Sequence, residues 1–290
     1  MGERIDAHHH LWRYSQEQYE WIGAGMEALA RNFLPADLQT ELTACGVDGS
    51  VVVQARQTLE ETDWLLGLAA DSSAIRGVIG WAPIADVKVL GVLERLKTKR
   101  KLKGLRHVIQ TEPDDAYILR KDFNDGITAL KNSGLVYDIL IYERHLPATI
   151  QFVDRHPGQI FVLDHVAKPR IKDRVVEPWR SNLTELAKRE NVHCKLSGMI
   201  TEGDWTNWTV NDLRPYVDAA LAAFGPRRLM FGSDWPVCLL GCNYGTWFQV
   251  AHDLLAELSA SEKDLVFGGV AARIYSLDSF EPTRGSTQER

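Results

Sequence analysis

Residues 159–166, QIFVLDHV, form a short run of apolar residues that ends in an acid, a histidine and a valine. A strand that is buried on both faces requires such a nearly continuous run, because neither of its faces meets water. Seven similar segments occur along the chain, at residues 4–9, 49–55, 76–84, 103–109, 135–142, 192–198 and 228–234. The sequence therefore predicts eight strands of a buried, parallel sheet.

The segments between these runs predict helices that carry the chain back across the sheet. Residues 35–46 start with Pro35 in the first turn and stop at Gly46, and residues 121–134 stop at Gly134. Eight strand–helix units in 290 residues favour a closed (β/α)8 TIM barrel over an open, doubly wound sheet. No G-x-G-x-x-G pattern follows the first strand. We expect an α/β barrel of one domain over residues 1–278 and a C-terminal tail at 279–290.

Composition and charge exclude several classes of function. The 39 acidic and 33 basic residues are mixed along the chain, so there is no electrostatic footprint for nucleic acid. No apolar stretch reaches the roughly 20 residues that span a bilayer. The four cysteines lack the spacing of a zinc ribbon or a disulfide framework. We therefore expect a cytoplasmic monomer or homodimer with a small-molecule ligand, and neither a nucleic-acid nor a membrane partner.

The first predicted strand ends in two histidines that share a face. His8 and His10 are two residues apart and project to the same side of an extended chain, whereas His9 projects to the other side. A barrel confines its chemistry to this end of the strands. The pair suits one divalent ion, because imidazole nitrogen is a favoured zinc ligand. The alternatives are a remnant of an expression tag and a simple hydrogen-bonded pair, and three histidines inside an amphipathic strand are too few for a tag.

Polar residues also end the sixth and eighth predicted strands. Asp164 and His165 lie on opposite faces, and His165 completes a cluster with the first strand unless it is a hydrogen-bonded core histidine. Asp234 follows a buried run and a glycine, which places it at the barrel mouth. A buried carboxylate is costly without a partner, so Asp234 needs a metal, a histidine or solvent beside it, unless it caps the next helix.

The ordered set of motifs resembles the amidohydrolase superfamily, in particular its lactonase branch. These motifs are D-x-H-x-H at 6–10, D-H-x-x-K-P at 164–169 and G-S-D-W-P at 232–236. The H-x-H pattern alone is weak, but the ordered set is specific and the resemblance runs over nearly the whole chain. It implies a (β/α)8 hydrolase that opens a sugar-acid lactone, such as an L-fucono- or L-rhamnono-lactone, to the free acid.

The resemblance also implies roles for the residues at the strand ends. Asp234 is the expected general base, with His165 as the second catalytic residue. The expected metal ligands are His8, His10, His165 and Asp234. Superfamily members with two metals use a lysine or glutamate on the fourth strand and a histidine on the fifth, and residues 103–109 and 135–142 offer neither in the expected place. The resemblance therefore implies one divalent ion, zinc first, or a site without metal, as in some lactonases of this branch.

Other polar and aromatic residues near strand ends are candidates for contacts with the hydroxyls and ring of a sugar lactone. They are Gln54, Arg56, Trp81, Arg106, His107, Tyr137, Asp138 and Trp235. A structural ion pair for Arg106 and a core position for Trp81 are the alternatives. Two other functions compete with the lactonase, namely a zinc-dependent decarboxylase of the same superfamily and a non-catalytic barrel that binds sugar acids. A Ser-His-Asp hydrolase is disfavoured, because the chain has no G-x-S-x-G elbow.

Overall fold

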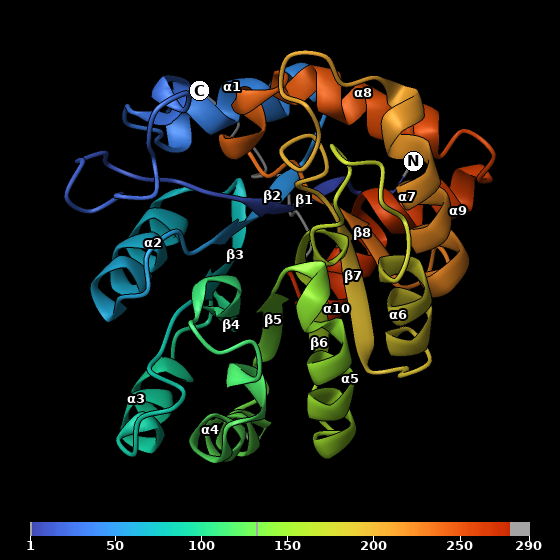
Figure 1. The fold of residues 1–290 in the computed structure, drawn as a ribbon. Coiled ribbons are helices and arrows are strands. Elements are labelled where there is room, and N and C mark those ends of the chain that lie inside the picture. The colour runs from blue at the N-terminus through green and yellow to red at the C-terminus, as the bar shows by residue number, and fades with distance from the viewer. Residues whose placement is uncertain (1, 132, 279–290) are drawn as a thin grey trace, which may run out of the picture.

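The computed structural model describes residues 2–131 and 133–278, and all eight predicted strands are present in it. They form one parallel sheet in chain order (Figure 1). The strands are β1 (Ile5–His9), β2 (Gly49–Val53), β3 (Ile75–Gly80), β4 (Leu102–Val108), β5 (Val136–Leu140), β6 (Phe161–Leu163), β7 (Val192–Leu196) and β8 (Leu229–Phe231). The tail that we expect at 279–290 lies outside the described residues.

The sheet closes between β1 and β8 through backbone contacts just beyond the strand ends. The backbone N–H of His10 donates to the carbonyl of Trp235 at 2.7 Å, and that of Asp234 donates to the carbonyl of His8 at 2.8 Å. His9 and Trp235 form a parallel bridge. The predicted (β/α)8 barrel is therefore confirmed, and its closure joins the two segments that carry the candidate ligands.

Helices surround the strands (Figure 1). They are α1 (Pro35–Cys45), α2 (Leu59–Asp71), α3 (Val89–Leu96), α4 (Lys121–Lys131), α5 (Leu146–Arg155), α6 (Trp179–Leu186), α7 (Val210–Phe224), α8 (Tyr244–Leu254), α9 (Ala260–Asp264) and α10 (Val270–Ile274). As predicted, α1 starts at Pro35 and is followed by Gly46 at φ 62°, a left-handed conformation that glycine adopts without strain. No helix in the described ranges is long and apolar enough to cross a membrane.

Short helical turns occupy several of the loops. They are η1 (Glu27–Leu29), η2 (Ile109–Thr111), η3 (Tyr117–Leu119), η4 (Glu143–His145), η5 (Asp164–Ala167), η6 (Val237–Leu240) and the π-helical η7 (Leu265–Gly269). One of them, η5, directly follows β6, and η6 begins at Val237, a short segment after β8 ends at Phe231. These turns redirect the chain where the candidate site residues lie.

Two apolar layers hold the barrel together. The inner layer is made by side chains that face the barrel axis, among them Val51, Val53 and Met230, and it includes Tyr275 just after α10. The outer layer, to which Val52 belongs, packs the strands against the helices. The interior is thus filled with side chains, which leaves the C-terminal ends of the strands for chemistry.

A β-bulge in β1 sets the direction of its histidines. Asp6 pairs with Ser50 but His9 pairs with Val52, so β1 has one residue more than β2 over this stretch. An extra residue reverses the in–out alternation of a strand. Ile5 and Ala7 lie in the inner apolar layer, and yet the next residue, His8, also faces the barrel axis. Without the bulge, the alternation that buries Ile5 and Ala7 would turn His8 outward.

Candidate metal and catalytic centre

Four side chains converge at the mouth of the barrel. The Nε2 atoms of His8, His10 and His165 lie 3.7, 3.5 and 3.9 Å from the same oxygen, Oδ1 of Asp234. All four residues are buried. His8 lies in β1, and the other three residues follow the ends of β1, β6 and β8. The structure thus brings together, from positions far apart in the sequence, the set that the motifs indicate.

Hydrogen bonds on the far side of two rings fix their orientation. Nδ1 of His10 lies 2.8 Å from the carbonyl oxygen of Val53, which accepts only, so this nitrogen carries the proton. Nδ1 of His165 lies 2.8 Å from Oγ of Ser197. With Nδ1 protonated, Nε2 of His10 keeps its lone pair. Nε2 of His10 and Nε2 of His165 both face Oδ1 of Asp234. Metal-binding histidines are held by outer hydrogen bonds of this type.

His8 occupies the centre of the cluster. Its Nδ1 lies 3.3 Å from Oδ1 of Asp164 and 3.2 Å from Nζ of Lys195. Its Nε2 lies 3.2 Å from Nε2 of His10 and 3.4 Å from the Arg106 guanidinium. When Nδ1 donates to Asp164, the Nε2 lone pairs of His8 and His10 face each other, which a shared cation stabilises.

The donor set fits one divalent ion. Ligand atoms of His8, His10 and Asp234 lie within 4.8 Å of one another, as do those of His8, Asp164 and His165. Imidazole nitrogens combined with a carboxylate oxygen are ligands that zinc prefers. His8 belongs to both groups, so the two groups compete for this ligand.

Buried charges below this centre hold His8 and Asp164 in place. Lys195 on β7 lies 2.5 Å from Oδ2 of Asp138 and 3.0 Å from Oδ1 of Asp164, and all three side chains are fully buried. The Tyr275 hydroxyl donates to Asp138 at 3.0 Å. Arg106 donates to Oδ2 of Asp164 at 2.9 Å. Lys195 is not among the site residues predicted from the sequence, although a lysine inside an otherwise apolar strand is a signal for such a network.

Burial and neighbouring charges set the protonation states. Burial lowers the pKa of His8 well below 6.5 and that of His165 to about 4, so both rings are neutral at pH 7. Burial acts to raise the pKa of Asp234, but His165, His10 and Lys168 outweigh it and hold the pKa below 3.8. The centre therefore presents the neutral imidazoles of His8 and His165 and an ionised carboxylate, which are the states that metal binding and general-base catalysis require.

The backbone is strained where it presents two of these residues. Asp234 has φ 56°, and His165 to Lys168 are four consecutive residues with φ between 47° and 60°. Left-handed backbone costs about 1–2 kcal/mol per non-glycine residue. The turn is held by Trp179, whose Nε1 donates to the carbonyl of Val166 at 2.7 Å. Strain of this kind persists only where the surroundings impose it and clusters at functional sites.

Gly198 leaves room for His165, which gives a testable prediction. A Cβ at this position would lie 2.5 Å from Nδ1 of His165, and Gly198 has φ +63°. We expect Gly198→Ala to displace the ring from Ser197 and to weaken zinc binding by about 10–100-fold, the usual loss when an outer partner of a ligand is removed. Competition with a chromogenic chelator measures this affinity.

Gly134 provides the matched control, because it has φ +74° and no atom within 4 Å of its added Cβ. Gly134→Ala introduces similar backbone strain without touching the centre. If both variants keep the zinc affinity of the parent, Gly198 does not position His165.

A cavity of about 330 Å³ opens over the centre. Its wall includes the cations Arg106 and Lys168, the amides of Gln57 and Gln110, and the indole of Trp21, which is 43% exposed. Oε1 of Gln110 is buried and has no hydrogen-bond partner within the described ranges. The cavity thus offers cations, unused polar atoms and an aromatic face to a ligand the size of a monosaccharide.

Four of the expected substrate-binding residues are buried away from this cavity. Tyr137 is fully buried and packs edge-on against the rings of Phe123 and Phe161. Asp138 is held by Lys195 and Tyr275. Gln54 and Trp235 are also buried, and Gln54 donates to the carbonyl of Arg106 at 3.4 Å. We expected these side chains to meet substrate, and the structure instead places them in the core.

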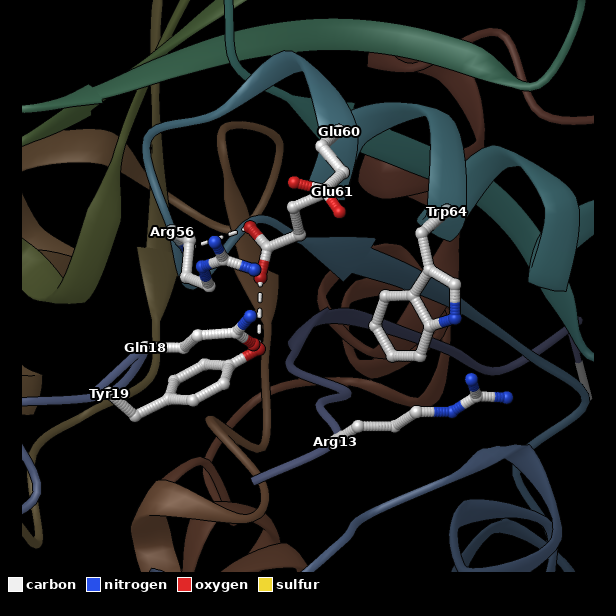
Figure 2. A pocket seen from close by; sticks show the side chains of 7 residues that line it. All are labelled: Arg13, Gln18, Tyr19, Arg56, Glu60, Glu61 and Trp64. Carbon is white, nitrogen blue, oxygen red and sulfur yellow. Dashed lines mark hydrogen bonds between the residues drawn. The ribbon is translucent and has the colours of Figure 1, made fainter. Parts of the chain in front are cut away.

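The other four expected residues are Arg56, Trp81, Arg106 and His107, and the last two are buried. Nε1 of Trp81 donates to Nδ1 of His107 at 3.3 Å, and Nε2 of His107 lies 2.6 Å from Glu112. Arg56 lines a second cavity (Figure 2). Of the eight residues expected to contact substrate, Arg106 is the one that lines the cavity over the centre.

The chain is similar to known proteins over nearly its whole length. Residues 5–277 match the family model described as Amidohydrolase. An L-fucono-1,5-lactonase from Burkholderia multivorans is 44% identical over 287 residues, covering 94% of this chain and 96% of the relative. An L-fucono-1,5-lactonase from Burkholderia ambifaria is 36% identical over 282 residues, covering 96% and 97%. A crystal structure of an amidohydrolase from Burkholderia multivorans with bound zinc is 42% identical, with a TM-score of 0.91, and the match covers 96% of this chain and 100% of that one.

Proposed function

The chain belongs to the amidohydrolase family, and we propose that it hydrolyses a sugar-acid lactone, such as L-fucono-1,5-lactone, to the free acid. The observation that carries the proposal is the convergence of three imidazoles on the ionised Asp234 beneath a cavity of monosaccharide size. Two lactonase relatives at 44% and 36% identity favour this function over a decarboxylase or a binding barrel. A cytoplasmic monomer or homodimer stays our prediction from the sequence.

Hydrolysis of a lactone needs an activated water, stabilisation of the oxyanion and a proton for the leaving oxygen. Asp234 accepts the proton from water as the water oxygen bonds to the carbonyl carbon. The bond between that carbon and the ring oxygen then breaks. Asp234 returns its proton to the ring oxygen, which becomes a hydroxyl, and the product is the open-chain acid.

Charge on the cavity wall stabilises the oxyanion. Arg106 and Lys168 both line the cavity. Lys168 is held over the Tyr142 ring at 5.6 Å and lies 3.4 Å from Glu202. Zinc held by His8, His10, His165 and Asp234 would supply a further positive charge for the carbonyl oxygen.

A panel of aldonolactones tests the function. The rate of proton release is measured with and without chelator, and the spontaneous rate in the same buffer is subtracted. We expect at least one six-carbon lactone to be hydrolysed well above that rate. Absence of any enzymatic rate across the panel would exclude the lactonase. Release of carbon dioxide from an unsaturated acid would then identify the decarboxylase, and ligand binding without turnover would identify a binding barrel.

The number of metal ions is a separate prediction. We expect at most one zinc per chain, because His8 is shared by both groups of possible ligands. Elemental analysis of the purified protein measures this number, and His8→Asn is expected to lower the bound zinc because it removes the central ligand. Two tightly held equivalents would show that the described residues include a second site that we have missed.

A further inference from the structure

A second cavity has a volume of about 280 Å³, and Figure 2 shows the side chains that line it. Its lining comes from three segments, namely residues 13–19 in the loop after β1, Arg56 in the loop after β2, and residues 60–64 in α2. Figure 2 shows the Trp64 ring on one side of the space and the side chains of Gln18 and Tyr19 on the other. Neither the family match nor the proposed hydrolysis assigns a role to it.

The two cavities share a wall. Gln18 and Tyr19 line the second cavity, whereas Trp21, two residues later, lines the active-site cavity. Arg56 likewise lines the second cavity, and the adjacent Gln57 lines the first. A ligand in the second cavity is therefore separated from the active site by two short chain segments.

The shared wall is held firmly by Glu61, which is 2% exposed. One carboxylate oxygen accepts the backbone N–H groups of Ala55 at 3.0 Å and Arg56 at 2.7 Å, and the other accepts the Tyr19 hydroxyl at 3.4 Å. Burial raises the pKa of Glu61 to about 7. These contacts join the loops after β1 and β2, so the shared wall of the cavity is fixed by hydrogen bonds.

Arg13 brings a cation to the edge of this cavity. Its side chain lies 6.0 Å from the centre of the Trp64 ring, and no carboxylate within the described ranges pairs with it. A guanidinium recognises a carboxylate through two parallel hydrogen bonds. Arg13 is exposed and, within those ranges, unpaired, so its guanidinium is available to a negatively charged group of a ligand.

The remaining lining selects for hydroxyl groups. The aromatic faces of Trp64 and Tyr19 suit the apolar face of a sugar, and the amide of Gln18 and the carboxylate of Glu60 accept hydrogen bonds from hydroxyls. A simple anion such as phosphate offers no carbon chain to the Trp64 ring. A neutral sugar leaves Arg13 without a partner. The lining as a whole fits a ligand whose carbon chain carries several hydroxyls and a carboxylate.

We propose that this cavity is a second ligand site that binds a polyhydroxylated carboxylate of the aldonate class, with Arg13 on the carboxylate and Trp64 against the carbon chain. The chemical class follows from the lining alone. That this ligand is the acid released in the neighbouring cavity rests on the proposed function.

Calorimetric titration of the full chain with L-fuconate tests the proposal. We expect two aldonates per chain in the parent. Arg13→Gln is expected to weaken one of the two sites by about ten-fold or more, as the loss of a charge-assisted hydrogen bond does. Trp64→Leu, which keeps an apolar side chain but removes the ring, is expected to weaken the same site. Neither residue touches the centre, so turnover at low lactone concentration is expected to stay within about two-fold.

The controls separate the parts of the argument. Arg100→Gln removes a cation that is 83% exposed and lies just before β4, and it is expected to leave both sites intact. Galactitol lacks the carboxylate and acetate lacks the hydroxyls, so neither is expected to fill the second site. One aldonate per chain in the parent, or two unchanged sites in both variants, overturns the proposal. If no lactone is hydrolysed but Arg13-dependent binding persists, the proposed function fails and the second site stands.

Discussion

Asp234→Asn is expected to lower kcat/KM for the best aldonolactone by about 10²–10⁴-fold, the range that positioned acid–base catalysis contributes. Asparagine keeps the shape of the side chain but cannot accept the proton from water. It also tolerates the left-handed backbone that this position requires, at φ 56°, better than most residues. We therefore expect the unfolding midpoint to change little while turnover collapses.

Loss of metal must be distinguished from loss of the base in this variant. Zinc content is measured on the same sample, and the assay is repeated with added zinc. If the loss of the general base causes the loss of turnover, added zinc does not restore it. Hydrolysis within about three-fold of the parent, after subtraction of the spontaneous rate, lies far below the acid–base range and contradicts the role of Asp234.

The fold was predictable because the barrel strands are buried on both faces. Each one appears in the sequence as a nearly continuous apolar run, and all eight predicted segments overlap a strand. Their ends were harder to place. Residues 159–166 predicted one strand, but β6 ends at Leu163 because His165 and Val166 adopt left-handed backbone. That turn is imposed by contacts such as the bond from Trp179, which no local pattern in the sequence shows.

The site was predictable to the extent that its residues stand at strand ends. His8, His10, His165 and Asp234 follow apolar runs, and parallel strands bring such ends together. The β1 bulge that turns His8 inward was not predictable, because it depends on the pairing of β1 with β2.

Most of the residues that we expected to contact substrate do not line the cavity over the centre, since alternation within a strand does not say which face is inner. Tyr137 and Asp138 are neighbours, and one packs among aromatic rings while the other meets Lys195 inside the barrel. Trp21, Gln57 and Gln110 lie on loops, where periodicity carries no information about position. Their place on the cavity wall emerges only once the barrel has closed.

Lys195→Met is expected to destabilise the protein by about 3–5 kcal/mol, because it leaves two buried carboxylates without their cation. Lys195 contacts Asp138 and Asp164, and all three side chains are fully buried. Lys188 gives the matched control, since its ammonium lies at the same distance, 2.5 Å, from Glu185, but the two side chains are 66% and 43% exposed. Lys188→Met is expected to cost at most about 1 kcal/mol. Urea unfolding at pH 7 measures both variants, and equal costs would refute the role of burial.

The pH dependence of the Lys195→Met deficit provides an independent check on its cause. In the parent, burial raises the pKa of Asp138 from 3.8 to about 6, although Lys195 opposes this shift. Without the lysine, the pKa of Asp138 in the folded state rises further above its value in the unfolded chain. A raised carboxyl pKa means that the folded state binds the proton more tightly, so folded stability is gained as the pH falls through that pKa. The deficit relative to the parent is therefore expected to shrink between pH 7 and pH 5. A deficit that stays constant over this range would point to lost side-chain packing, because packing does not titrate.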